Sequence, residues 1–115
     1  MTERDLLLVF SNPKPGQDEA YNDWYDRIHL AEILAVPGVA SGRRYEFHRV
    51  ETPGTEERPA HRHLALYELD RDPREVMAEC ARRTASGEIG MHESLDAGAM
   101  SVAVWRARGP LQEGT

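Results

Sequence analysis

The chain has 115 residues, of which 40% are hydrophobic and 30% charged, and this balance is typical of one globular domain spanning residues 1–115. A net charge of −6 argues against a nucleic-acid-binding or anionic-lipid-binding surface, and the longest apolar run, residues 6–10, is too short to cross a membrane. The single cysteine, Cys80, excludes an internal disulfide and a cysteine-based zinc site, so we expect a cytoplasmic protein.

The first third of the chain predicts a strand followed by a helix. Residues 5–11 are dense in Leu, Val and Phe, and they meet the chain-reversing segment NPKPG at residues 12–16. A helix is expected over residues 17–35, because acidic residues occupy its first turn, where they suit the helix dipole. The segment VPG at residues 36–38 ends this helix, since a residue before proline is disfavoured in helical conformation.

The remainder predicts two strands, a second helix and a last strand. Extended segments are expected over residues 39–50 and 63–69, and a polar loop at residues 51–58 separates them. The second helix, within residues 72–87, begins with an N-cap Asp, a first-position Pro and a capping-box Glu, and it ends at a glycine. The last strand is expected over residues 100–106.

This β-α-β-β-α-β order predicts a ferredoxin-like α+β fold with a four-stranded antiparallel sheet. Residues 88–99 carry no clear signal, apart from one irregular helical turn near residues 91–95. Both helices would cover one face of the sheet, so the other face would expose alternate residues of the apolar run at 6–10. Monomers rarely leave such a patch in water, and we therefore expect a homodimer in which sheet packs on sheet.

Residues 21–32 carry the side chains best suited to acid–base chemistry. The core-facing arc of an ideal helix would contain Tyr21, Trp24, Tyr25, Ile28, Ala31 and Ala35. His29 lies at the edge of this arc, and it could take or give a proton near neutral pH. Glu32 could orient the imidazole, and Tyr25 or Tyr67 could polarise a carbonyl oxygen. Alternatively, both residues have only a structural role: His29 makes one hydrogen bond in the core, and Glu32 pairs with an arginine.

Other polar residues are weaker candidates. His61 and His63 are expected to face one side of a strand, but two ligands do not complete a metal site, and we expect no metal. Arg43 and Arg44 alternate between the faces of their strand, so one of them points inward. An inward arginine either binds an anionic group or pairs with a carboxylate.

Four segments together resemble the dimeric α+β barrel superfamily, and within it the EthD-like group. They are the NPKPG turn at residues 12–16, the W-Y-x-x-x-H helix at 24–29, the P-G-x-x-x-x-x-R-Y stretch at 37–45 and the strand HLALYEL at 63–69. The match extends over about residues 6–70. The resemblance implies a homodimer whose sheets close into a barrel, with one ligand pocket per subunit between sheet and helices, and we expect no cofactor.

In the cyclases of that superfamily, a first-helix histidine works with a tyrosine, and by position these are His29 and Tyr67. The resemblance implies a cofactor-independent cyclase, lyase or isomerase. In such an enzyme His29 removes a proton next to a carbonyl of a small aromatic or polyketide-like substrate, and Tyr25 or Tyr67 steadies the enolate. The alternatives are a cofactor-free monooxygenase and a protein that binds a small molecule without turnover. The residues expected to contact the substrate are Asn22, Trp24, Glu32, Arg44, Tyr45 and Phe47.

Overall fold

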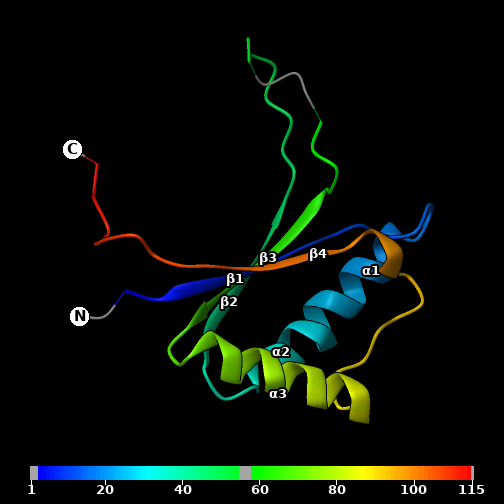
Figure 1. The fold of residues 1–115 in the computed structure, drawn as a ribbon. Helices are drawn as coiled ribbons and strands as arrows, with labels where there is room; N and C mark the ends of the chain where they lie inside the picture. The colour runs from blue at the N-terminus through cyan, green and yellow to red at the C-terminus, as the bar shows by residue number, and fades with distance from the viewer. Residues whose placement is uncertain (1–2, 55–57, 115) are drawn as a thin grey trace.

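The computed structural model describes residues 3–54 and 58–114, and its elements follow the predicted order (Figure 1). In chain order they are β1 (Asp5–Ser11), α1 (Asp18–Trp24), η1 (Tyr25–His29), α2 (Leu30–Leu34), β2 (Val39–Glu46), β3 (His63–Leu69), α3 (Pro73–Ser86), η2 (Ala97–Ala99) and β4 (Ser101–Trp105). The bounds predicted for the first and third strands are confirmed. The strand expected over residues 39–50 ends earlier, at Glu46, and residues 55–57 of the predicted polar loop lie outside the described residues.

The four strands form one antiparallel sheet in the order β2-β3-β1-β4, and the helices cover one face of it (Figure 1). Leu7 of β1 pairs with Tyr67 of β3, which pairs in turn with Gly42 of β2. These residues face the helices, and Leu7 and Tyr67 are buried there. Leu8 and Leu66, paired one residue further along, point to the opposite face. The ferredoxin-like α+β fold predicted from the sequence is confirmed.

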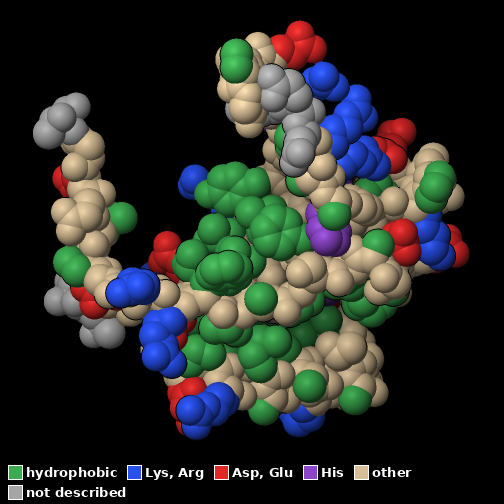
Figure 2. Space-filling view, turned by 45° about the horizontal axis from the view of Figure 1, so that its top comes forward, with side chains coloured by type: hydrophobic (Ala, Val, Ile, Leu, Met, Phe, Trp, Pro, Cys, Tyr) green, Lys and Arg blue, Asp and Glu red, His purple; other side chains and the backbone are tan. Residues whose placement is uncertain are grey.

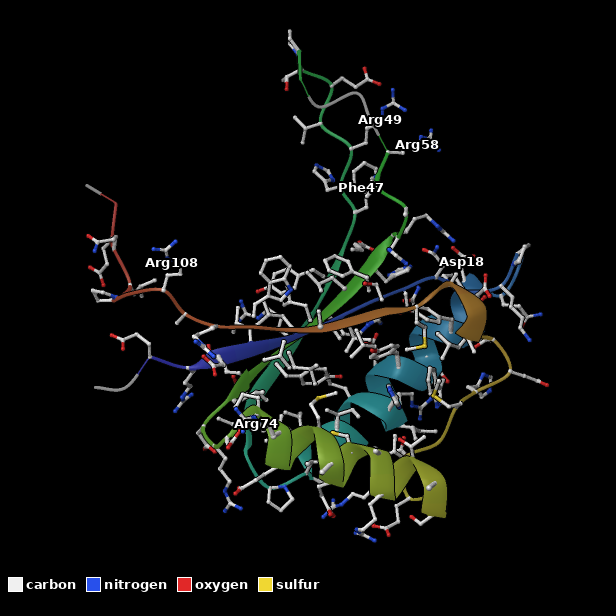
Figure 3. All side chains as sticks on the ribbon, viewed as in Figure 1. Asp18, Phe47, Arg49, Arg58, Arg74 and Arg108 are labelled. Carbon is white, nitrogen blue, oxygen red and sulfur yellow. The ribbon has the colours of Figure 1, made fainter. Side chains whose placement is uncertain are left out.

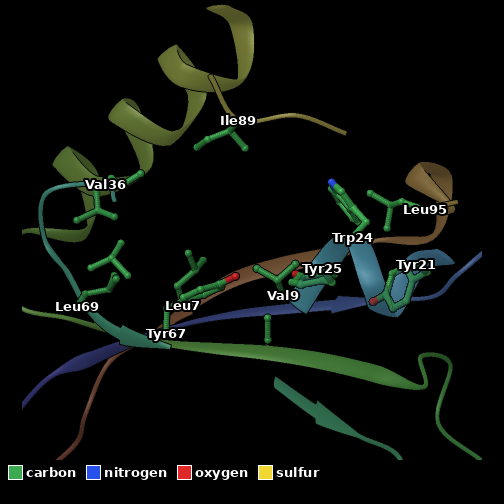
Figure 4. Close-up of a cluster of buried hydrophobic side chains, with 13 residues drawn as sticks. Leu7, Val9, Tyr21, Trp24, Tyr25, Val36, Tyr67, Leu69, Ile89 and Leu95 are labelled. Atoms are coloured by element: carbon green, nitrogen blue, oxygen red, sulfur yellow. The ribbon is translucent and has the colours of Figure 1, made fainter. Parts of the chain in front are cut away.

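A hydrophobic core fills the space between the sheet and the helices (Figure 4). Trp24 and Tyr25 enter it from the first helical run, Tyr67 from β3 and Val76 from α3. Such aromatic side chains bury large areas and dominate the energetics of a small core. Two residues assigned to catalysis by sequence analysis, Tyr25 and Tyr67, are therefore also part of the core.

The helix predicted over residues 17–35 is one continuous run whose middle is the π-helical turn η1. The backbone N–H of Leu30 donates to the carbonyl of Tyr25, five residues back instead of four. This extra residue rotates the following side chains by about 100° around the helix axis. Ile28, expected in the core, is consequently 52% exposed, whereas His29 is only 6% exposed. The other residues wrongly expected on the core-facing arc are Ala31 and Ala35, which are exposed.

The second helix, α3, begins and ends where the sequence predicts. The Asp72 side chain accepts a hydrogen bond from the Arg74 backbone N–H at 2.9 Å, and Gly87 ends the helix with a left-handed φ of 86°. Near residues 91–95 the chain makes a single hydrogen-bonded turn instead of a helical one, with the Leu95 N–H donating to the His92 carbonyl at 3.1 Å. The short helix η2 follows this turn.

The sheet face away from the helices is uncovered, and hydrophobic side chains gather on it (Figure 2). Its apolar residues include Leu6, Leu8, Phe10, Tyr45, Leu64, Leu66 and Trp105. Residues 47–54 and 58–62, between β2 and β3, project beyond the sheet as an arm, along which Phe47, Arg49 and Arg58 lie (Figure 3). The uncovered apolar face predicted from the sequence is confirmed. Within residues 3–54 and 58–114, no helix has the length and hydropathy needed to cross a membrane.

Candidate active site

A buried histidine with a carboxylate on one ring nitrogen forms the centre of the site. Nδ1 of His29 lies 3.2 Å from Oε1 of Glu32. Burial lowers the pKa of His29, although the Glu32 carboxylate opposes this change. Because the carboxylate accepts the hydrogen bond, Nδ1 carries the proton of the neutral ring, and Nε2 is the nitrogen left able to accept one.

The π turn brings this imidazole against two aromatic rings of the same helical run. His29 stacks on Trp24, with ring centroids 4.5 Å apart and planes 26° apart. It meets Tyr25 edge-on, at 4.9 Å and 89°. Such π turns occur frequently at functional sites, because the widened turn re-aims neighbouring side chains. The structure therefore brings together His29, Tyr25, Trp24 and Glu32, all candidate site residues from the sequence.

Two buried phenols belong to the same cluster. Burial raises the pKa of Tyr25 to about 12, and burial together with the neighbouring Tyr25 raises the pKa of Tyr67 far above its ordinary value. Both phenols are therefore protonated at neutral pH and able to donate a hydrogen bond. The Tyr67 hydroxyl is buried beside the Tyr25 hydroxyl, and it makes no hydrogen bond of good geometry with any residue that the structure describes. A buried hydroxyl in this state is costly, and an oxygen atom of a ligand would satisfy it.

Arg44 of β2 lies against the ring of Tyr25. Its guanidinium lies 4.5 Å from the centroid of the Tyr25 ring, and it donates to Oδ1 of Asp26 at 2.7 Å and to Oδ1 of Asn22 at 2.9 Å. Of the two roles left open for an inward arginine, the structure shows pairing with a carboxylate. Asp26 is a residue that sequence reasoning missed, because the pair joins a helix to an edge strand and no spacing rule indicates it.

Two of the expected substrate contacts lie away from this cluster. Tyr45 pairs with Leu64 on the uncovered face, whereas Arg44 faces the helices, because successive residues of a strand point to opposite faces. Phe47 lies beyond the end of β2 at the base of the arm and is 39% exposed (Figure 3). Within one chain, the structure does not bring Tyr45 or Phe47 together with His29.

The H-x-H pair does not face one side, contrary to expectation. His63 is buried and contacts the Tyr21 ring at 4.9 Å, whereas His61 contacts Phe10, a residue of the uncovered face, at 5.9 Å. Strand alternation does not extend to His61, because β3 begins only at His63. No three His, Cys, Asp or Glu side chains in the described part of the chain are placed to hold a metal ion.

Acidification should destabilise the fold through the two buried histidines. Burial lowers the pKa of both His29 and His63 below the value of 6.5 expected in the unfolded chain. Below about pH 6.5 the unfolded chain binds protons that the folded chain does not, so the free energy of unfolding falls as the pH decreases through the folded pKa values. Urea denaturation between about pH 8 and pH 5.5 measures this slope. His29→Gln should flatten it, whereas replacement of the exposed His48 by glutamine should leave it unchanged.

The space in which the resemblance implies a ligand pocket is occupied by core side chains in the single chain, among them Leu7, Tyr25 and Tyr67 (Figure 4). A surface depression of about 350 Å³ lies instead at the turn between β1 and α1, lined by Lys14, Pro15, Gln17 and Glu93. With His29 only 6% exposed, a substrate reaches its imidazole only after covering residues move.

Comparison with solved structures finds the same fold in several proteins. An EthD family protein from Bacillus halodurans is 18% identical, covers 90% of this chain and 98% of its own, and superposes with a TM-score of 0.60. SnoaB, a cofactor-independent oxygenase from Streptomyces nogalater, is 12% identical over 97% of this chain and 100% of its own, with a TM-score of 0.56. A dimeric ferredoxin-like protein from Jannaschia is 16% identical over 90% of this chain and 99% of its own, with a TM-score of 0.52.

No protein-family model matches the chain, and no curated protein matches its sequence. At identities of 12–18%, the structural matches demonstrate a shared fold and leave the chemistry to be argued from the residues. The chain therefore shares its fold with an EthD family protein and with a dimeric ferredoxin-like protein, as the resemblance in the sequence led us to expect.

Proposed function

We propose that this protein is a cofactor-independent enzyme that removes a proton next to a carbonyl group, as a cyclase, lyase or isomerase does. Its substrate class is a small carbonyl, aromatic or polyketide-like compound. The observation that carries the proposal is the packing of buried His29, paired with the partly exposed Glu32, against Tyr25, which neighbours the hydroxyl of Tyr67. One base and two phenol donors thus belong to one buried cluster.

His29 is suited to act as the general base. Burial keeps the imidazole neutral at neutral pH, and Glu32 holds the proton on Nδ1. The lone pair on Nε2 then accepts the proton from the carbon next to the substrate carbonyl. Glu32 stabilises the imidazolium that forms, because its carboxylate lies 3.2 Å from Nδ1. The proton returns from Nε2 to the product carbon or oxygen in the second half of the reaction.

The phenols are suited to hold the enolate. As the C–H bond breaks, its electron pair moves onto the carbonyl oxygen, where negative charge develops. Tyr25 and Tyr67 remain protonated in their buried environment, so their hydroxyls can donate to that oxygen. The Arg44 guanidinium, 4.5 Å from the centroid of the Tyr25 ring, places a positive charge next to this phenol and opposes the rise of its pKa.

A cofactor-free monooxygenase is the second candidate, and the cofactor-independent oxygenase SnoaB with the same fold favours it. The first step would be the same removal of a proton by His29. The enolate carbon would then form a bond to molecular oxygen, and the resulting hydroperoxide would lose water to leave a ketone. A CH2 group and O2 are thereby converted to a C=O group and H2O, so the substrate itself is the reductant. Consumption of oxygen in step with loss of substrate distinguishes this reaction from a cyclase, lyase or isomerase reaction.

The test is exchange of carbon-bound hydrogen for deuterium. A panel of small ketones and aromatic diketones is incubated with the protein in D2O, and loss of the signals of the protons next to the carbonyl is followed by 1H NMR. We expect faster exchange than with the same concentration of free imidazole. Ligand binding without exchange or oxygen consumption would contradict the enzymatic proposal and indicate a small-molecule-binding protein.

We infer that two copies of the chain pack through the uncovered sheet face. Apolar side chains of β1, β3 and β4 lie on this face, and monomers rarely expose a patch of this kind. The ferredoxin-like protein from Jannaschia with the same fold is described as dimeric. A homodimer with sheet against sheet would cover the patch and leave the helices outside.

Leu8→Glu should convert the dimer into a monomer. Leu8 points to the uncovered face from the inner strand β1, so the variant would bury a carboxylate in the interface without a partner. Sedimentation or light scattering after gel filtration measures the mass. Ala78→Glu, at an exposed position of α3, is the matched control and should remain dimeric. A wild-type monomer, or an unchanged dimer in the Leu8 variant, would contradict this interface.

A further inference from the structure

The segment after α3 crosses the site as a short strap, residues 90–93, between two fixed points. Before it, Ile89 is buried, and its N–H donates to the Arg83 carbonyl at 3.0 Å. After it, the Ser94 carbonyl accepts a hydrogen bond from the Lys14 N–H at 2.8 Å, and Leu95 is buried in the core. The strap itself is neither helix nor strand, and the Met91 side chain at its centre is 49% exposed.

The first contact of the strap is with the carboxylate that holds the base. The Gly90 N–H donates to Oε1 of Glu32 at 3.3 Å, and this is the same oxygen that lies 3.2 Å from Nδ1 of His29. Oε1 of Glu32 therefore accepts hydrogen bonds from both the strap and the imidazole. A carboxylate that shares one oxygen between two donors stabilises each of them less than it would stabilise one alone.

The second contact is with the aromatic ring on which the base stacks. His92 stacks on Trp24, with centroids 5.6 Å apart and planes 24° apart, and the same indole stacks on His29 at 4.5 Å. His92 is oriented in turn by Ser94, whose N–H donates to its Nδ1 at 3.1 Å. The strap thus contacts two side chains that themselves contact His29, namely Glu32 and Trp24.

We propose that Gly90 and His92 are positioning residues of a movable strap, which fixes His29 when it is closed and uncovers the imidazole for substrate when it lifts. The inference rests on the proposed role of His29 as the base. Closed, the strap holds Glu32 and Trp24 in the arrangement that orients the imidazole. When the strap lifts, the hydrogen bond from Gly90 to Glu32 breaks. The carboxylate then accepts a hydrogen bond from His29 only, at the time when substrate enters.

The titratable groups around His29 determine how its pKa would change when the strap lifts. From its own helical run, Glu32 and Tyr25 contact the imidazole, and from the strap His92 approaches across Trp24. The charge of Glu32 favours the protonated imidazole, and burial disfavours it. Lifting the strap removes a competing donor from Glu32 and admits water, so both changes raise the pKa of His29.

Gly90→Pro and Gly90→Ala test this inference as a matched pair. Proline removes the N–H that binds Glu32, whereas alanine keeps it, and a Cβ at this position would lie 4.0 Å from Oε2 of Glu32, an ordinary contact distance. The pKa of His29 is measured by NMR titration of the imidazole. We expect a higher pKa in Gly90→Pro and an unchanged one in Gly90→Ala. Equal values in all three proteins would overturn the proposal.

His92→Ala provides an independent measurement should the proline variant fail to fold. Diethyl pyrocarbonate modifies accessible neutral imidazoles, and mass spectrometry gives the rate for each histidine. Loss of the His92 ring should raise the rate at His29 several-fold, while His48 and His61 serve as internal references. An unchanged rate at His29 would contradict the strap. Neither measurement needs a substrate. The strap can therefore be refuted while His29 still catalyses deuterium exchange, and it can be supported even if His29 catalyses no exchange.

Discussion

Replacing His29 with alanine is expected to lower the catalysed rate of deuterium exchange by about 100- to 10,000-fold, the usual contribution of a positioned general base. The reason is that Nε2 of His29 accepts the proton in the proposed reaction, and the neighbouring phenols, held protonated by burial, cannot replace it. In the wild-type protein the rate should rise with pH through the pKa of His29, which burial places below 6.5, and then level off. That limb should be absent from the variant.

The matched control is His48→Ala, since His48 is exposed and lies beyond the end of β2. This variant should exchange protons as the wild type does. Tyr67→Phe completes the set, because it removes only the buried hydroxyl and keeps the ring. Undiminished exchange in the His29 variant would refute the role of the imidazole, whatever the phenols contribute.

The second large effect is expected at Gly42, where any side chain would meet the Tyr67 ring. A Cβ built there would lie 2.7 Å from Cδ1 and 3.0 Å from Cε1 of Tyr67, and 3.2 Å from Cδ2 of Leu34. Leu34 is 38% exposed and can move, whereas Tyr67 is fully buried and cannot move without disturbing the core. Overpacking of this kind costs about 1–3 kcal/mol, against a gain of up to about 1 kcal/mol from a stiffer unfolded chain. Gly42→Ala should therefore unfold at lower urea concentration.

Gly109→Ala is the control for that experiment, because a Cβ at Gly109 would meet nothing within 4 Å. It should unfold at nearly the wild-type urea concentration. Since a displaced Tyr67 ring also moves the hydroxyl proposed to hold the enolate, Gly42→Ala should reduce deuterium exchange as well. Wild-type stability in Gly42→Ala would mean that the close approach of β2 to Tyr67 is not a constraint on the fold.

The fold could be predicted because its signals are local. The Leu- and Val-rich run of β1, the alternation of β3 and the capping residues of α3 each specify their element within a few positions. The order of these elements then implies the sheet with helices on one face. Alternation along β1 indicated which of its residues lie on the uncovered face, and Leu8 is one of them.

The site could be predicted only in part, because it depends on a departure from ideal geometry. An ideal helix places Ile28 toward the core, whereas the π turn exposes Ile28 and buries His29. The contact of Arg44 with Asp26 depends on how β2 packs against the first helix, and no periodic pattern in the sequence indicates this packing. Gly90 lies in a segment without a regular pattern, so its hydrogen bond to Glu32 had no signal in the sequence.

The role of His29 as a base is tested most directly by its protonation state, measured by 15N NMR of the imidazole nitrogens at neutral pH. We expect a neutral ring with the proton on Nδ1, facing Glu32, and a lone pair on Nε2. Glu32→Gln should leave the ring neutral but weaken the preference for this tautomer. An imidazolium at neutral pH, or a neutral ring with its proton on Nε2, would contradict the claim that His29 is poised to accept a proton from a substrate.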